Sequence, residues 1–186
     1  MIDALGVQFT TYIATCLYTG VSTDTGCFRY SNTTEGSHLL AARLIGAGID
    51  YATLNRVLFE TKSRERAQLE QMAIASMEFA LDGKAAFITV SRAMIEKAGC
   101  DPSDIEGITP IPRTIEGVDV GVTLRELSSG NWKVSVRTVT VDAAALCALF
   151  GGGGHKRAAG FESSLSEPEV KRAVIAEAAK MLKAGT

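Results

Sequence analysis

The residues best suited to chemistry lie together at 150–161, which read Phe-Gly-Gly-Gly-Gly-His-Lys-Arg-Ala-Ala-Gly-Phe. Glycine tolerates backbone angles that are closed to other residues, so consecutive glycine amides can turn inward and form a concave anion site. His155, Lys156 and Arg157 follow directly and add ring and cationic donors. We therefore expect this segment to bind an anion, and a phosphate in particular. The alternative is a glycine turn that joins a helix to a strand.

The run GGGGHKRAAG resembles the glycine-rich signature of the DHH-associated C-terminal domain. That domain ends many bacterial DHH-family phosphoesterases, including the nanoRNase and pAp-phosphatase group. The resemblance extends over essentially all 186 residues. It implies that Gly152, Gly153, Gly154 and His155 bind the substrate.

A second motif, Thr-Asp-Thr-Gly at 23–26, is similar to the last metal motif of the same family, in which an aspartate follows a helix. On that match Asp24 is a metal ligand, and a carboxylate suits hard divalent cations such as manganese or magnesium. We expect the hydroxyls of Thr23 and Thr25 to hold its second oxygen, and Gly26 to turn the chain. Without the resemblance, the motif reads as an Asx turn that caps the next segment.

Further substrate contacts are expected in a strand at 132–138. Ser135 and Arg137 alternate with apolar residues and so share one face, where Arg137 can offer a bidentate fork to a phosphate. Both match a Ser-x-Arg that contacts substrate in the family; the alternative is a solvated strand face. We expect Lys133 and Arg125 to be ordinary strand-surface charges.

Arg29 and Asn32 match positions near the substrate cleft of the family, and either could instead hydrogen-bond within its loop. The Asp-His-His motif that names the family does not occur in the sequence, and the only histidines are His38 and His155. We expect His38 to be a surface or packing residue. Asp24 alone cannot build a two-metal centre. The chain therefore reads as the C-terminal part of a longer enzyme, inactive alone, whose partner is its missing N-terminal half.

The composition is that of a folded protein of the cell interior. The apolar fraction is 46% and the net charge is −2, so any phosphate binding must be local rather than the work of a global basic field. Four cysteines show no metal spacing, and we expect reduced, mostly buried thiols. No apolar run is long enough to span a membrane, and the expected location is the cytoplasm.

Apolar periodicity and capping residues predict alternating helices and strands. The fold class is α/β (α+β): the helical end of a DHH domain at 1–62, a connecting helix at 63–80, and a DHH-associated domain with a mixed sheet and flanking helices at 81–186. In the first part of the chain, helices are expected from Thr10 or Thr11 to near Gly20, at 35–47, and after Asp50. The third of these is expected to bury Leu54, Val57 and Leu58. Further helices are expected from Ser63 to about Met77, after Ser91, at 143–150 and after Ser166. Strands are expected at 85–90, 117–126 and 132–138.

The resemblance implies hydrolysis of a phosphoester by water activated on manganese or magnesium ions, which this chain alone is not expected to hold tightly. The expected substrate is a short oligonucleotide, pAp or a related dinucleotide, and we allow for a homodimer. Two alternatives remain: a non-catalytic nucleotide- or RNA-binding module, and a hydrolase of polyphosphate. Base-stacking by Phe150 and Phe161 would argue against polyphosphate; otherwise both belong to the core.

Overall fold

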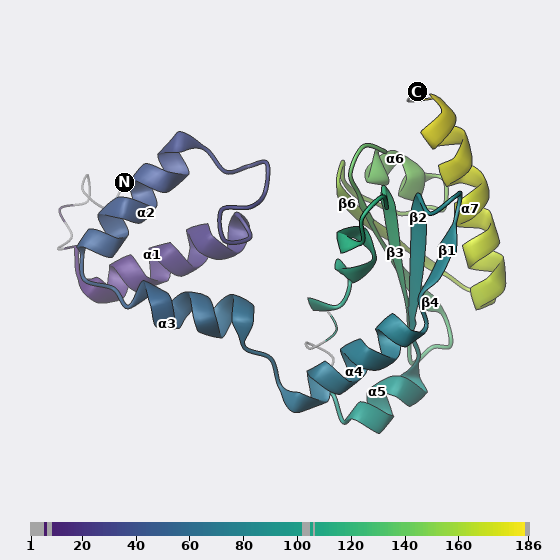
Figure 1. Cartoon of the computed structure of the whole chain (residues 1–186), viewed down its shortest axis with the longest axis horizontal. Helices are drawn as coiled ribbons and strands as arrows, with labels where there is room; N and C mark the ends of the chain where they lie inside the picture. Colours follow the sequence, from purple (N-terminus) through teal and green to yellow (C-terminus); the bar gives the residue numbers. More distant parts are fainter. Residues whose placement is uncertain (1–5, 7–8, 102–104, 106, 185–186) are drawn as a thin grey trace. The chain divides into compact units, whose positions relative to one another are not determined.

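The computed structural model describes residue 6 and residues 9–101, 105 and 107–184. The chain forms two compact units, Met1–Lys62 and Ser63–Thr186, each with a core of its own (Figure 1).

The first unit is helical, and polar caps set where its helices begin. Thr10, Thr34 and Asp50 each accept a hydrogen bond from a backbone N–H in the first turn of the helix that follows. The helices are α1 (Thr11–Asp24), α2 (Glu35–Gly46) and α3 (Tyr51–Asn55), followed by a π-helical turn at Arg56–Glu60. Their shared core consists of Ala14, Tyr18, Ala41, Leu44 and Ile49.

Two expectations for this unit were wrong. Helix α1 does not stop near Gly20 but continues to Asp24, so the aspartate ends the helix rather than following it. Val57 and Leu58 were expected inward, but they are 56% and 37% exposed. The backbone forms a π-helical turn after Asn55, which has more residues per turn than an α-helix. Val57 and Leu58 therefore lose the spacing that would align them with Leu54.

The second unit is built on a six-stranded mixed sheet in the order β1-β2-β3-β4-β6-β5. The β2–β3 pair is parallel and every other pair is antiparallel. The strands are β1 (Glu78–Ala80), β2 (Ala85–Val90), β3 (Val120–Glu126), β4 (Trp132–Thr138), β5 (Gly153–His155) and β6 (Ala158–Ser163). The helices are α4 (Arg64–Ala75), α5 (Arg92–Ala98), α6 (Ala143–Ala148) and α7 (Glu167–Ala184), with a 3-10 turn at Ile111–Thr114.

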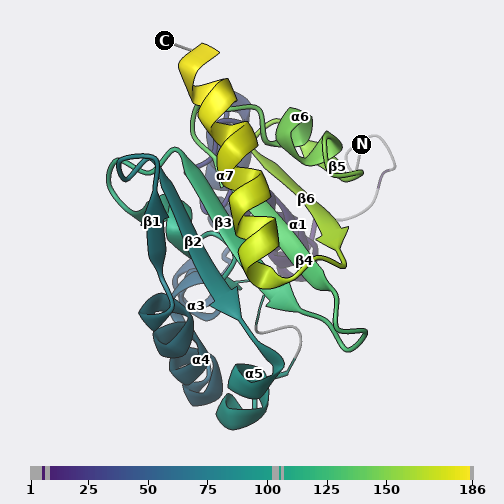
Figure 2. The same ribbon diagram turned by 90° about the vertical axis from the view of Figure 1, so that its right-hand side faces the viewer.

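Helices cover the two faces of the sheet unequally. On one face α6 and α7 bury alternate residues of β2, β3, β4 and β6, including Phe87, Val122 and Val136; Figure 2 shows α7 lying across this face. On the other face α4, α5 and Ile108 pack on Ile88 and Val90 of β2. This second layer ends at β3, so β4, β6 and β5 are open there.

The three predicted strands are confirmed: β2 and β4 have the expected bounds, and β3 begins three residues later than predicted. Strands β1, β5 and β6 were not predicted. Two are only three residues long, and β5 and β6 consist largely of glycine and alanine, which carry little strand signal. The segment expected as a connecting helix is helical only at Arg64–Ala75, and Glu78–Ala80 joins the sheet.

All four cysteines are free, but the expectation that most are buried was wrong. Cys147 is buried, Cys16 is exposed, and Cys27 and Cys100 are partly exposed. Cys16 lies on the opposite side of α1 from the core residues Ala14 and Tyr18, because helical residues two apart do not share a face. Among the described residues, every helix is too short or too polar to cross a membrane.

Candidate functional site

The open part of the sheet carries a groove of about 500 Å³. It lies on the face opposite α7, because its strand residues alternate with Val134, Val136 and Phe161, which point into the core beneath α7. Thr109 forms one edge, where its carbonyl oxygen accepts a hydrogen bond of 3.1 Å from the hydroxyl of Thr123. The groove is lined by Thr109, Lys133, Ser135, Arg137, Gly153, Gly154, Ala158, Ala159 and Gly160.

Strand register brings four of the predicted binding residues, Ser135, Arg137, Gly153 and Gly154, into the lining of the groove, whereas Gly152 and His155 lie beside it in sequence but do not line it. Ser135 lies opposite Gly160, and Gly160 lies opposite Gly153. Arg137 lies opposite Ala158, and Ala158 lies opposite His155. Directly opposed residues of antiparallel strands share a face, so small residues of β6 separate the polar residues of β4 from those of β5. The floor is therefore shallow at its centre and polar along its side.

The glycines of the run have different structural roles. The amides of Gly151 and Gly152 donate to the carbonyls of Ala148 and Cys147, both at 3.0–3.1 Å, and so end helix α6. Both amides are therefore engaged and do not point toward an anion. From the sequence, the amides of all four glycines were expected to do so. Gly153 and Gly154 belong to β5 and line the groove. The run is thus both a helix-to-strand connection and part of a cavity wall.

Close approach explains why two of these positions are glycine. A Cβ atom on Gly152 would lie 2.3 Å from the carbonyl oxygen of Gly160. Gly154 has a φ of +145°, and a Cβ there would lie 2.7 Å from the carbonyl oxygen of Ala158. Gly153 has nothing within 4 Å of an added Cβ. Gly152 and Gly154 are required for packing, whereas Gly153 leaves space free.

The basic residues after the glycines form the turn between β5 and β6. His155 is exposed at the end of β5. The Arg157 guanidinium donates to the carbonyl oxygen of Val141 at 3.1 Å, and the Lys156 carbonyl accepts from the amide of Ala143 at 2.8 Å. The Arg157 guanidinium therefore has a structural role, whereas the side chains of His155 and Lys156 are exposed donors.

Asp24 lies at the end of α1, where Gly26, Cys27 and Phe28 all adopt positive φ and reverse the chain. Its carboxylate accepts a hydrogen bond of 3.0 Å from the side-chain amide of Asn32. That amide also donates to the Asp24 carbonyl at 3.2 Å. Asn32, predicted as a substrate contact, thus orients the predicted metal ligand and closes the turn.

The threonines beside Asp24 do not hold its second oxygen as expected. The hydroxyl of Thr23 donates to the Thr19 carbonyl at 2.8 Å, and that of Thr25 donates to the Val21 carbonyl at 2.7 Å. Both positions lie on a helix end, where a threonine hydroxyl reaches back to the carbonyl four residues earlier. Arg29 donates through Nε to the Gly26 carbonyl at 2.7 Å, so its guanidinium also stabilises the loop.

The described residues do not form a complete metal site. No group of three or more histidine, cysteine, aspartate or glutamate side chains comes together among them. Asp24 can supply one carboxylate. His38 is exposed and stacks on Phe28 with ring centroids 5.1 Å apart, as expected of a packing residue. The side chains of the described residues are therefore too few to hold a two-metal centre.

The aromatic residues that flank the glycine run belong to the core. Phe161 is 7% exposed, and Phe150 stacks on it with ring centroids 4.7 Å apart. Neither lines the groove. Burial raises the pKa of the neighbouring Cys147 thiol to about 11, against a smaller opposing effect of Arg137, so this thiol is not a poised nucleophile.

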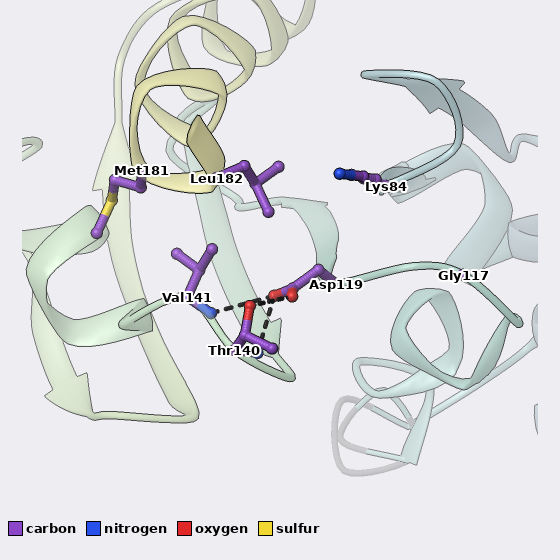
Figure 3. Close-up of a pocket in the computed structure, with 7 residues that line it drawn as sticks. All are labelled: Lys84, Gly117, Asp119, Thr140, Val141, Met181 and Leu182. Atoms are coloured by element: carbon purple, nitrogen blue, oxygen red, sulfur yellow. Dashed lines mark hydrogen bonds between the residues drawn. The ribbon is translucent and has the colours of Figure 1, made fainter. Parts of the chain in front are cut away.

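A smaller hollow of about 340 Å³ lies near the end of α7, lined in part by Lys84, Asp119 and Thr140 (Figure 3). The Asp119 carboxylate accepts hydrogen bonds from the hydroxyl and amide of Thr140 and from the amide of Val141. Burial raises the pKa of Asp119, but these hydrogen bonds outweigh burial and lower it overall. Because its carboxylate is engaged in holding the 139–141 loop, Asp119 is a structural residue.

The curated proteins that this chain is similar to include two NrnA proteins. The chain is 38% identical over 162 residues to the bifunctional oligoribonuclease and PAP phosphatase NrnA of Thermus thermophilus, covering 86% of this chain and 48% of that protein. It is 29% identical over 157 residues to the probable bifunctional oligoribonuclease and PAP phosphatase NrnA of Streptococcus mutans, covering 84% and 50%. The chain thus spans about half the length of these relatives.

Among solved structures, an exopolyphosphatase-related protein from Bacteroides fragilis superimposes with a TM-score of 0.84 at 29% identity, covering 92% of this chain and 51% of that one. The match confirms the mixed α/β fold. Residues 82–184, which include every residue that lines the groove, match the DHHA1 domain. Because that match takes in more than half of the sequence, the chain belongs to the DHHA1 family, the DHH-associated domain that its glycine-rich segment indicated.

Proposed function

We propose that this chain is the substrate-binding part of a DHH-family phosphoesterase that acts on short oligonucleotides or pAp. The observation that carries the proposal is the groove, where Ser135, Arg137 and Gly153 meet over a floor of alanine and glycine. The names of the two NrnA relatives supply the substrate class. The groove offers what such a substrate needs, which is a cation, a hydroxyl and space for the sugar-phosphate backbone.

In this proposal Arg137 binds a phosphate through its guanidinium fork, and Ser135 adds a hydroxyl from the same face of β4. Gly153 and Gly154 let the substrate approach the backbone of β5, and His155 adds a donor at the end of that strand. These contacts fix the position of the substrate, which favours the reaction by holding the scissile bond in place.

Manganese or magnesium, when bound, would supply charge stabilisation and an activated water. Asp24 would contribute one carboxylate, which Asn32 orients. The first unit also exposes large apolar side chains on its helices, including Tyr12 at 78% and Leu39 at 64%. We propose that these side chains pack against the further part of the catalytic domain that supplies the other ligands.

The polyphosphate alternative keeps one supporting observation. None of the described residues that line the groove is aromatic, so they offer no platform for stacking a base. A competition experiment separates the two substrates: pAp should displace a labelled oligonucleotide at lower concentration than tripolyphosphate does. The reverse order would favour the polyphosphate hydrolase.

The proposal is tested by replacing Arg137 with alanine. Loss of a hydrogen-bonded charged contact costs about 1.5–3 kcal/mol, so Arg137→Ala should weaken pAp or short-RNA binding roughly ten- to a hundredfold. Arg172→Ala is the matched control, because Arg172 is an exposed arginine on α7, which covers the opposite face of the sheet. Equal affinity of wild type and Arg137→Ala in a titration would leave β4 as an ordinary solvated strand face.

A further inference from the structure

We propose a second phosphate subsite at Arg125 and Lys133, at the end of the groove away from Arg137, which binds a further phosphate of an oligonucleotide. This inference rests on the proposed function and deepens it. It assigns a binding role to two residues that the sequence alone presents as ordinary strand-surface charges.

Strand register places these cations together. Arg125 of β3 lies directly opposite Lys133 of β4. Lys133, Ser135 and Arg137 are two residues apart in sequence and therefore share the groove face. At ~3.4 Å per residue, the Cα atoms of Lys133 and Arg137 are roughly 13 Å apart, with Ser135 between them. At this separation, Lys133 and Arg137 are better placed to bind two different phosphates than to share one.

The Arg125–Lys133 pair lacks the partners that a purely structural role would give it. The Nε atom of Arg125 is buried without a hydrogen-bond partner in the described part of the chain. A buried unsatisfied donor is costly, and like charges directly opposite each other on neighbouring strands are destabilising. An anion bound between the two side chains would relieve both costs.

The nearest acidic candidate is already engaged. Glu162 of β6 lies opposite Lys133, but its carboxylate accepts a hydrogen bond of 2.8 Å from the side-chain amide of Asn131. Within the described ranges, no ion pair joins Glu162 to Lys133. A bound phosphate would supply the acceptor that the Nε atom of Arg125 lacks.

The lining of the groove identifies that acceptor as a backbone phosphate rather than a base. The polar side chains on the lining are those of Thr109, Lys133, Ser135 and Arg137, and the remaining residues are glycine and alanine. Phosphate contacts position a nucleic acid without reading its sequence. Affinity should therefore rise with the number of phosphates and change little with the identity of the bases.

The test compares ligands of different length on the 186-residue chain. Binding of AMP and of a 5′-phosphorylated tetra-adenylate is measured by titration for wild type and for Lys133→Gln, Arg125→Gln and Arg137→Ala. Lys84→Gln is the matched control, because it removes the same charge from an exposed lysine at the other hollow. Fluorescence of Trp132, the only tryptophan, checks that each variant folds.

Lys133→Gln should weaken the tetranucleotide about tenfold and leave AMP within about twofold of wild type. The slope of log affinity against log salt concentration should fall by about 0.7 for the tetranucleotide alone, the value for one phosphate contact of a single strand. Arg125→Gln should act in the same direction, and Lys84→Gln should change neither ligand.

Four outcomes would contradict the inference or the proposed function on which it rests. Equal weakening of AMP and tetranucleotide by Lys133→Gln would mean a single phosphate site. No effect of Lys133→Gln, while Arg137→Ala weakens both ligands, would remove the second subsite and leave the proposed function intact. If Arg137→Ala also had no effect, the proposed function itself would fail. The fourth outcome is that tripolyphosphate binds as tightly as the tetranucleotide and loses the same affinity in Lys133→Gln. That result would reassign the subsite to inorganic phosphate chains.

Discussion

The groove of the second unit and the Asp24 turn of the first unit are built in opposite ways. The groove draws on β4 and on the adjacent strands β5 and β6, which are separated from β4 in sequence and are brought beside it by strand register. The Asp24 turn is local, because its hydrogen bonds join residues no more than eight positions apart. The groove gathers several side chains on one surface, whereas the turn presents a single carboxylate.

The hydrophobic core of the second unit is also larger than the described core of the first unit. The second unit packs helices on both faces of its sheet, and β2 is buried along its whole length. The described core of the first unit is Ala14, Tyr18, Ala41, Leu44 and Ile49. The proposed substrate groove therefore lies on a sheet with a large core, whereas the proposed metal site has a single carboxylate, Asp24, among the described residues. Experiments on catalysis, packing and charge can test this difference between the two units.

The largest expected effect is on catalysis. We expect no detectable hydrolysis of pAp, short RNA or cyclic dinucleotides by this chain with manganese present, because one carboxylate cannot assemble a two-metal centre. Manganese binding measured by calorimetry should be weak for the same reason. Extending the chain with the N-terminal half of its catalytic domain should restore turnover, and Asp24→Ala should abolish it there.

In that longer protein, Asp24→Ala should depress kcat, whereas His155→Ala should mainly raise KM, since His155 contacts substrate in our proposal. Manganese-dependent hydrolysis by the 186-residue chain itself, removed by Asp24→Ala, would break the contrast. It would show that the first unit holds a more complete metal site than its described residues indicate.

The next effect concerns the groove wall. Gly154→Ala should destabilise the second unit by about 2–3 kcal/mol, because the added methyl meets backbone atoms and the positive φ disfavours alanine. Gly153→Ala should be neutral or stabilising by up to about 1 kcal/mol, since its Cβ meets open space. Urea unfolding followed by Trp132 fluorescence measures both, because Trp132 lies in β4.

The same pair of variants separates folding from binding. Gly153 lines the groove, so the methyl of Gly153→Ala should weaken pAp binding in a protein that remains fully folded. Loss of stability in Gly153→Ala equal to that in Gly154→Ala would show that the whole run serves packing, with no position reserved for a ligand.

The sequence predicted much of the second unit because its signals are strong and local. The alternation in Trp132–Thr138 predicted β4 with its observed bounds, and by itself it puts Ser135 and Arg137 on one face. The polar caps likewise marked where α1, α2 and α3 begin. These features depend on neighbours in sequence, and periodicity reports such neighbours directly.

Other parts of the site depend on contacts between distant residues and left no such signal. Strand β6 is recognisable only through its pairing with β4 and β5. Lys133 looks like any exposed lysine until register places Arg125 opposite it. Similarly, the pairing of Asn32 with Asp24 follows from three successive residues at positive φ, two of which are not glycine. The sequence predicted that Gly26 turns the chain, but no residue pattern predicts that the non-glycine residues Cys27 and Phe28 continue the turn.

The smallest effect compares two carboxylates, Asp119 in the second unit and Asp24 in the first. Asp119 accepts three hydrogen bonds from the 139–141 loop, and the Val141 carbonyl of that loop accepts from Arg157 at the end of the groove wall. Asp119→Asn should therefore lower the stability reported by Trp132 by about 1 kcal/mol at pH 7, the typical value for hydrogen bonds that are partly open to solvent. Asp24→Asn is the control and should leave it unchanged.

The pH dependence of that difference has a definite sign. Because the pKa of Asp119 is lowered in the folded protein, its carboxylate stabilises the fold at any pH above the unfolded pKa, about 3.9, and this stabilisation is lost as the pH falls further. The gap in urea midpoint between wild type and Asp119→Asn should thus be constant from pH 7 to about pH 5 and shrink below about pH 4. A gap that persisted undiminished at pH 3 would mean that the amide disturbs the loop sterically. The contribution of Asp119 to stability would then come from the shape of its side chain in the loop, and not from the charge of its carboxylate.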